Sequence, residues 1–206
     1  MSVSADDVRQ LILSDLDDQG IVFPDALFLR QLSRCQGWIA LRYHLLRETV
    51  PVLSVPNAPF YAMPVIAPRM VVVTHMQRGD GTVLWPVPFA HLRYANPAWI
   101  GTTGTPLYFA RLGWRYVVLY PVPSVAEILQ MSGTVLPAPV GALTDLLQVP
   151  DVYVPQVVLL TAGMLVVSQE RRIPEGLERI RAALGIPSPQ AQPVSVVPTE
   201  VEEVRT

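Results

Sequence analysis

The side chains best suited to catalysis or metal binding are few and lie far apart in the sequence. None of the three histidines, His44, His75 and His91, belongs to a paired motif such as H-E-x-x-H, which places two imidazoles on one helix face to bind zinc. The single cysteine, Cys35, excludes an internal disulfide and every multi-cysteine metal site. The residues therefore predict no catalytic, cofactor-binding or metal site, although a triad assembled from distant residues stays open.

Three short motifs resemble functional sites: two lack an essential part, and the third has a simpler structural explanation. The acidic run at 15–20 begins like a calcium loop, but its fifth position is Gln19 and its twelfth is Ala26, where a bidentate glutamate belongs. Residues 101–104 lack the lysine and the spacing of a phosphate-binding loop. The Arg-Gly-Asp tripeptide at 78–80 is formally an integrin motif, yet Gly and Asp are also ordinary turn residues. We interpret it as a turn between two strands.

The composition favours protein–protein contact. Of the 206 residues, 50% are hydrophobic and 16% are charged, against a typical charged share of roughly 25%. So few charges cannot cover the surface, and we expect apolar surface to lie in contacts with other proteins. The net charge of −2, with no block of basic residues, gives no electrostatic footprint for holding DNA by its phosphates.

The chain is long enough for one domain with an insertion.

Its N-terminus lacks the basic and apolar regions of a signal peptide, and the longest apolar run, 157–167, is shorter than the roughly 18 residues of a membrane span. We expect a soluble protein made in the cytoplasm. The 21 prolines suit loops, strand ends and extended arms better than a helix bundle.

Helical patterns lie at both ends of the chain. Ser4 and Asp7 predict a capping box that opens a helix to about position 18. A longer helix is predicted from Pro24 to about Glu48, with Cys35 on its apolar side. Its four arginines lie off that side and form either a solvated face or a subunit interface: Arg30, Arg34, Arg42 and Arg47. Two more helices are predicted, a buried one at 156–169 and an amphipathic one at 174–184.

The middle of the chain is rich in strand signals. Residues 70–75 and 82–85 predict a hairpin, and 89–94 a short helix or turn. The segment 124–131 is ambiguous, since Ser124 and Glu127 could also cap a short helix there. The expected fold is α+β, a helical core of two N-terminal and two C-terminal helices with an inserted antiparallel β-rich region and an extended C-terminal arm. The expected boundaries are 1–50 for the N-terminal helices, 51–123 for the β-rich insertion, 124–186 for the strand, connection and C-terminal helices, and 187–206 for the arm.

The C-terminal arm combines prolines, which forbid a helix, with valines, which favour an extended chain. Such a segment is either a disordered tail or an arm held by a partner, and we expect the second. The valines expected to contact a partner protein or a neighbouring subunit are Val194, Val196, Val197, Val201 and Val204.

The stretch at 99–123 is the most distinctive in the chain. Aromatic and β-branched runs bounded by glycine and proline predict a β-hairpin turning at Gly113, and we expect Trp99, Tyr108, Trp114 and Tyr120 to be structural. The order of its residues resembles the β-insertion of head-to-tail adaptor proteins of tailed bacteriophages. The matching positions are Trp99, Gly104, Pro106, Tyr108, Gly113, Leu119, Tyr120, Pro121 and Pro123.

This resemblance implies a non-enzymatic structural protein of the virion neck, and it places a strand at the ambiguous segment 124–131. Such an adaptor forms a ring of twelve copies below the portal protein, extends the DNA channel without sequence-specific binding, and docks tail or stopper proteins; its C-terminal arm often docks onto the portal. Two alternatives stay open. One is a stopper or tail-completion ring protein of the neck, and the other is a small ligand-binding or enzymatic α+β domain, which would need a concave site with convergent polar groups.

Overall fold

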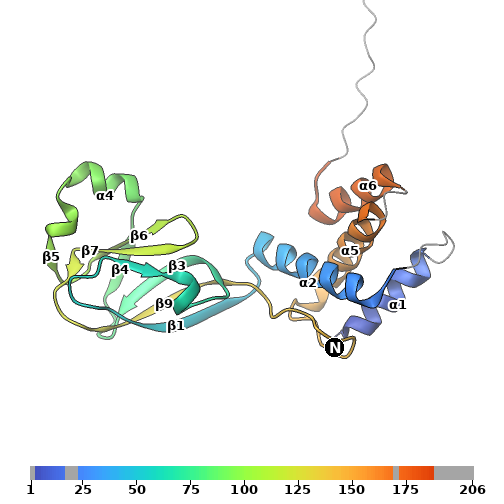
Figure 1. The fold of residues 1–206 in the computed structure, drawn as a ribbon, viewed down its shortest axis with the longest axis horizontal. Coiled ribbons are helices and arrows are strands. Elements are labelled where there is room, and N and C mark those ends of the chain that lie inside the picture. The colour runs from blue at the N-terminus through green and yellow to red at the C-terminus, as the bar shows by residue number, and fades with distance from the viewer. Residues whose placement is uncertain (1–2, 17–22, 169–171, 188–206) are drawn as a thin grey trace, which may run out of the picture.

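The computed structural model describes residues 3–16, 23–168 and 172–187 of the chain, which form a helical unit and a β-unit side by side (Figure 1). The helical unit is built from the two ends of the chain, and its helices are α1 (Ala5–Leu16), α2 (Asp25–Arg42), α5 (Val154–Ser168) and α6 (Ile173–Leu184). The β-unit comes from the middle. The fold is therefore α+β, as the sequence predicts.

The predicted capping box opens α1. The Asp7 carboxylate accepts a hydrogen bond from the Ser4 backbone N–H at 2.9 Å, and the Ser4 hydroxyl accepts one from the Asp7 N–H at 3.1 Å. The hydrogen bonds from Ser4 lower the pKa of Asp7. The α1 helix is described to Leu16, and most of the acidic run at 15–20 lies outside the described residues.

The second helix ends earlier than the sequence predicts. It stops at Arg42 and not near Glu48, because His44 adopts a left-handed φ of 51° and Arg47 already begins strand β1 (Arg47–Leu53). Leu46 extends the apolar periodicity of the helix, but it packs against both the helical core and the β-core. Leu46 is apolar because it packs at the junction between the two units. The apolar periodicity therefore continues beyond the end of α2, and the predicted helix was too long.

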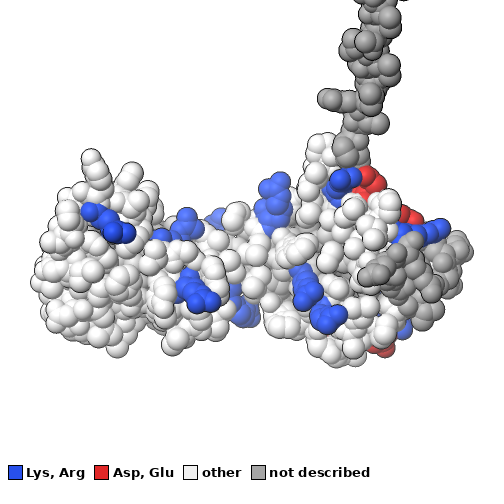
Figure 2. Space-filling model, turned by 45° about the horizontal axis from the view of Figure 1, so that its top comes forward, with Lys and Arg blue, Asp and Glu red and all other residues white. Residues whose placement is uncertain are grey.

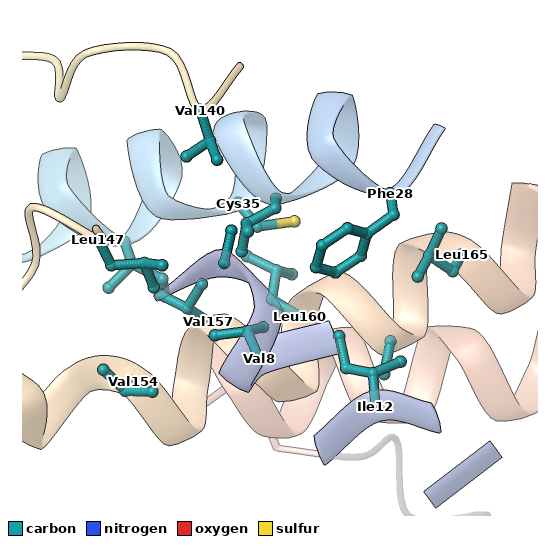
Figure 3. Close-up of a cluster of buried hydrophobic side chains, with 14 of the residues drawn as sticks. Val8, Ile12, Phe28, Cys35, Val140, Leu147, Val154, Val157, Leu160 and Leu165 are labelled. Carbon is teal, nitrogen blue, oxygen red and sulfur yellow. The ribbon is translucent and has the colours of Figure 1, made fainter. Parts of the chain in front are cut away.

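The helical core lies between α2 and α5, with α1 packed across them (Figure 3). Phe28 and Cys35 of α2 meet Leu160 and Leu165 of α5, and all four are at most 1% exposed. The prediction that Cys35 is a core residue is thus confirmed, and its burial raises the pKa of the thiol to about 11.

The fifth helix is apolar on nearly every face, as predicted for a buried helix. By length and composition alone the segment Asp151–Ser168 could cross a membrane. Here it packs as the central helix of the core, between α2 on one side and α6 on another. The last helix, α6, is amphipathic and ends as predicted at Gly185, which adopts the left-handed φ of 65° that favours glycine.

The β-unit is a curled, mostly antiparallel sheet of seven strands in the order β1-β9-β3-β4-β6-β7-β2, in which only β4 and β6 pair in parallel. The remaining strands are β2 (Phe60–Ala62), β3 (Met70–Arg78), β4 (Val83–Pro86), β6 (Tyr108–Leu112), β7 (Tyr116–Tyr120) and β9 (Ile128–Val135). Shorter elements complete it: α3 (Met63–Ile66), α4 (Phe89–Ala95), a 3₁₀ turn at Trp99–Gly101, and the pair β5 (Thr103–Gly104) and β8 (Val122–Pro123).

The sheet buries side chains on both of its faces. The larger β-core includes Met76 and Met131, which pair across β3 and β9, and Phe109 and Leu119, which pair across β6 and β7. A smaller core on the other face joins Ala110 and Val118 to residues in and beside α4. Because β7 is covered on both sides, its sequence is continuously apolar and does not alternate.

Two chain passages join the units, at 43–46 and at 136–150 (Figure 1). The second is held against α2 by polar side chains of that helix. The Gln36 amide donates to the Ala138 carbonyl at 3.0 Å, and the Val140 N–H donates to the Ser33 hydroxyl at 2.7 Å. These bonds satisfy backbone groups in a segment that has no regular structure of its own.

Candidate interaction surfaces

The three histidines lie in different parts of the fold. His44 bonds the Thr134 hydroxyl at 3.1 Å, whereas His75 lies within the sheet and His91 on the surface of α4. Among the residues that the structure describes, no three His, Cys, Asp or Glu side chains gather as metal ligands. Several exposed surfaces are further candidates for a functional role.

The Arg-Gly-Asp tripeptide is held within the turn between β3 and β4. Arg78 pairs with Asp80 at 3.1 Å and with Glu127 of the neighbouring strand region at 2.8 Å, and the Glu127 contact raises the pKa of the guanidinium. The Asp80 carboxylate accepts a hydrogen bond from the Thr82 N–H at 2.9 Å, which lowers its pKa. Both charged groups thus stabilise the turn, in line with the interpretation from sequence.

The residues of the distinctive stretch fall into three environments. Trp99 and Pro106 are buried, and the Trp99 ring meets Phe60 and Phe89 edge-on. Tyr108 and Tyr120 pair across the strands, and the Tyr120 hydroxyl accepts a hydrogen bond from the Asn96 amide at 3.2 Å. The glycines and Pro121 are at turns and short strands: Gly104 lies in β5, Gly113 turns the hairpin with a φ of 61°, and Pro121 connects β7 to β8.

The tip of the β6–β7 hairpin is a first exposed surface. Trp114, expected to be structural, is instead 61% exposed, and the Arg115 guanidinium lies 4.9 Å from the centre of its ring. Leu112 and Tyr116 flank it and are also exposed. A hollow of about 470 Å³ next to the tip is lined by Pro86, Val87, Pro88, Phe109, Arg111 and Gly113. An exposed indole stacked by arginine beside a hollow of mixed polarity is typical of a protein contact.

The outer side of α2 is a second surface, which we call the α2 stripe. Its exposed residues recur every fourth position, and Trp38 is 48% exposed between arginines one turn away on either side. The stripe comprises Arg30, Arg34, Trp38 and Arg42. Arginine and tryptophan are the residues most enriched where protein contacts contribute most energy.

A third surface is an open groove of about 620 Å³ between α1 and α5, which we call the α1–α5 groove. Val158 and Leu159 form its apolar wall, and Leu11 of α1, 52% exposed, stands at its lip. Asp15 and Arg179, which form an ion pair, close one side. The groove exposes apolar surface that a single subunit leaves uncovered.

Charge is segregated along the molecule, although the net charge is only −2. Positions 26–144 contain nine arginines against three acidic residues, whereas positions 1–25 contain six aspartates against one arginine. On the face drawn in Figure 2, the β-unit carries arginine and no acidic side chain, and the acidic side chains gather at the helical end. The net charge of the whole chain does not reveal this separation, because the positive and negative segments cancel.

Exposed aromatic, arginine and apolar side chains gathered on separate surfaces are typical of proteins that act by contacting other proteins. Comparison with known families identifies the particular class. The model of the SU10 adaptor protein matches residues 3–184, and the chain belongs to this family. It is a structural adaptor-type protein of a bacteriophage, and the family implies a virion component that contacts other capsid or tail components. A comparison with curated proteins gives no significant match.

Proposed function

We propose that this protein is a head-to-tail adaptor that forms a ring below the portal, extends the DNA channel and docks tail components. The observation that carries the proposal is the family match, which spans both units of the fold. The surfaces support it, since an adaptor must contact the portal on one side, neighbouring copies laterally, and a tail component on the other. The helical unit and the hairpin tip expose apolar and aromatic side chains at separate places for such contacts.

In this arrangement the helical unit packs against neighbouring copies and the portal, and the β-unit points outward or toward the tail. The hairpin tip is then the part of the β-unit that meets a tail or stopper protein, because Trp114 and Tyr116 contribute exposed ring surface there. The ring has twelve copies by analogy with the adaptor proteins that the sequence resembles, which is an argument from the family alone.

Electron microscopy of the protein mixed with the portal ring of its own virus tests the proposal. We expect a second ring stacked on the portal, and its symmetry gives the copy number. Free portal beside unattached protein contradicts the adaptor role. In that case the stopper or tail-completion role is tested next by mixing the protein with completed adaptor-bearing heads, which a stopper binds.

The C-terminal arm is proposed to anchor the subunit to the portal or to a neighbour. Its valines at positions 194–204 lie outside the described residues, and the last described helix, α6, ends before them at Leu184. We expect deletion of 187–206 to leave the melting temperature of the purified subunit within about 2 °C, because the side chains described in both cores come from residues before position 187. The same deletion should abolish assembly with the portal in a pull-down. A truncated protein that still joins the complex contradicts the anchor.

A further inference from the structure

The α2 stripe has the composition of an interface that lacks its partner. Its arginine side chains are exposed, and within the described part of the chain Arg30, Arg34 and Arg42 form no ion pair with an acidic side chain. Trp38 stands between them with about half of its surface open to water. Leaving so large an apolar ring exposed is unfavourable for a free subunit, and its flanking arginines favour a partner that is apolar at the centre and acidic around it.

The α1–α5 groove offers this combination. Its wall is apolar, and the α1 helix beside it exposes Asp6, Asp7 and Asp15 to solvent. The described N-terminal residues 3–16 carry three aspartates against one arginine, whereas α2, which contains the stripe, carries three arginines against one aspartate. The two surfaces are therefore complementary in charge as well as in polarity.

The stripe and the groove lie on different sides of the helical unit, so one subunit cannot join them. On α5, the residues packed toward α2 include Leu160 and Thr161, which lies beside Cys35. The groove residues Pro155, Val158 and Leu159 lie on the other side of the same helix, since each residue advances about 100° around its axis. The stripe in turn occupies the part of α2 that faces away from the core. A contact between the two surfaces must join different copies.

We propose that the α2 stripe of one subunit docks in the α1–α5 groove of the next subunit in the ring. The inference rests on the proposed ring-forming function and specifies its lateral contact. Trp38 enters the apolar groove, and the flanking arginines pair with the acidic side chains of the α1 helix. Because the two surfaces differ, the contact is head-to-tail, and its repetition builds a closed ring when the rotation between copies closes.

Cross-linking of engineered cysteines tests this contact in the full chain. The variant that carries both Arg34→Cys and Leu11→Cys places one thiol on the stripe and one at the lip of the groove. Cys35 stays in place, because its thiol is buried and weakly ionised. A flexible bis-maleimide should convert the double variant into a ladder from dimers up to the full ring. An equal mixture of the two single variants should stop at dimers, and each single variant alone should stay monomeric on a denaturing gel.

Several outcomes overturn the contact. Dimers from Arg34→Cys alone indicate a symmetric contact between two stripes, and rings visible by microscopy without a cross-linked ladder indicate that other surfaces join the copies. In the second case the adaptor function stands and only the contact fails. If neither rings nor a ladder form at any concentration, in the presence of the portal, both the function and the contact fail.

A second variant keeps the test independent of cross-linking. Replacing both exposed residues, Arg34→Glu with Trp38→Ala, should raise the concentration needed for half-assembly at least about 30-fold, as expected for residues at an interface hot spot. The matched control is Arg93→Glu with Tyr94→Ala on α4, which exposes a similar pair outside both surfaces and should assemble normally. The stripe variant could instead assemble normally but bind double-stranded DNA less tightly than the unchanged protein. That result would contradict the proposed contact between subunits and indicate that the stripe binds nucleic acid.

Discussion

Replacing Trp99 by alanine is expected to destabilise the β-unit by about 3–5 kcal/mol, the usual cost of removing a large aromatic side chain from a core. The Trp99 side chain is 4% exposed and packs edge-on against Phe60 and Phe89, with ring centres 5.7 and 5.6 Å away. The side chains packed in the same small core include Leu92, Ala110 and Val118, and removing the indole leaves a cavity among them. The measurement is urea denaturation followed by far-ultraviolet circular dichroism.

Trp114 provides the matched control, because it is the same residue type at the turn of the same stretch. Its side chain is 61% exposed and lies at the hairpin tip, so Trp114→Ala should change the free energy of unfolding by no more than about 0.5 kcal/mol. A loss below 1 kcal/mol for Trp99→Ala, or equal losses for the two variants, would show that the aromatic cluster does not stabilise the β-unit. The pair thus separates a packing role from an interaction role within one motif.

Much of the fold was open to prediction because local signals agreed with the final packing. The hairpin was predicted from its glycine turn and apolar strand, and β7 is apolar throughout because a core lies on each of its faces. The Ser4–Asp7 capping box, the buried α5 helix and the Gly185 stop were likewise predicted. In each case the residues that define the element lie within a few positions of one another.

The candidate surfaces were harder to predict because they depend on which residues pack nearby. The spacing of Arg30, Arg34 and Arg42 is visible in the sequence, but only the fold shows that Trp38 is exposed among them. The groove joins Leu11 to Leu159, which lie far apart in the chain, and no local pattern marks such a site. Trp114 was predicted to be structural for the same reason, since hydrophobicity alone does not distinguish a core tryptophan from an exposed one.

The close crossing of α5 and α6 depends on two glycines. Gly163 lies in the middle of α5, and Gly176 faces it from the first turn of α6. A Cβ added at Gly163 would lie 2.8 Å from the Gly176 carbonyl oxygen, 3.0 Å from Ile180 Cγ1 and 3.1 Å from Arg179 Cβ. The first of these atoms belongs to the backbone, so relief requires the helices to move apart.

Gly163→Ala is therefore expected to destabilise the helical unit by about 1–3 kcal/mol, the usual cost of overpacking. Helix propensity predicts the opposite, a gain of about 1 kcal/mol from replacing a mid-helix glycine by alanine. Gly37→Ala in α2 is the matched control, since its Cβ would lie at an ordinary 3.5 Å from Leu136 and the propensity gain should appear. Urea denaturation of both variants decides the question. Stabilisation by both would mean that α5 and α6 do not cross at the distance seen here.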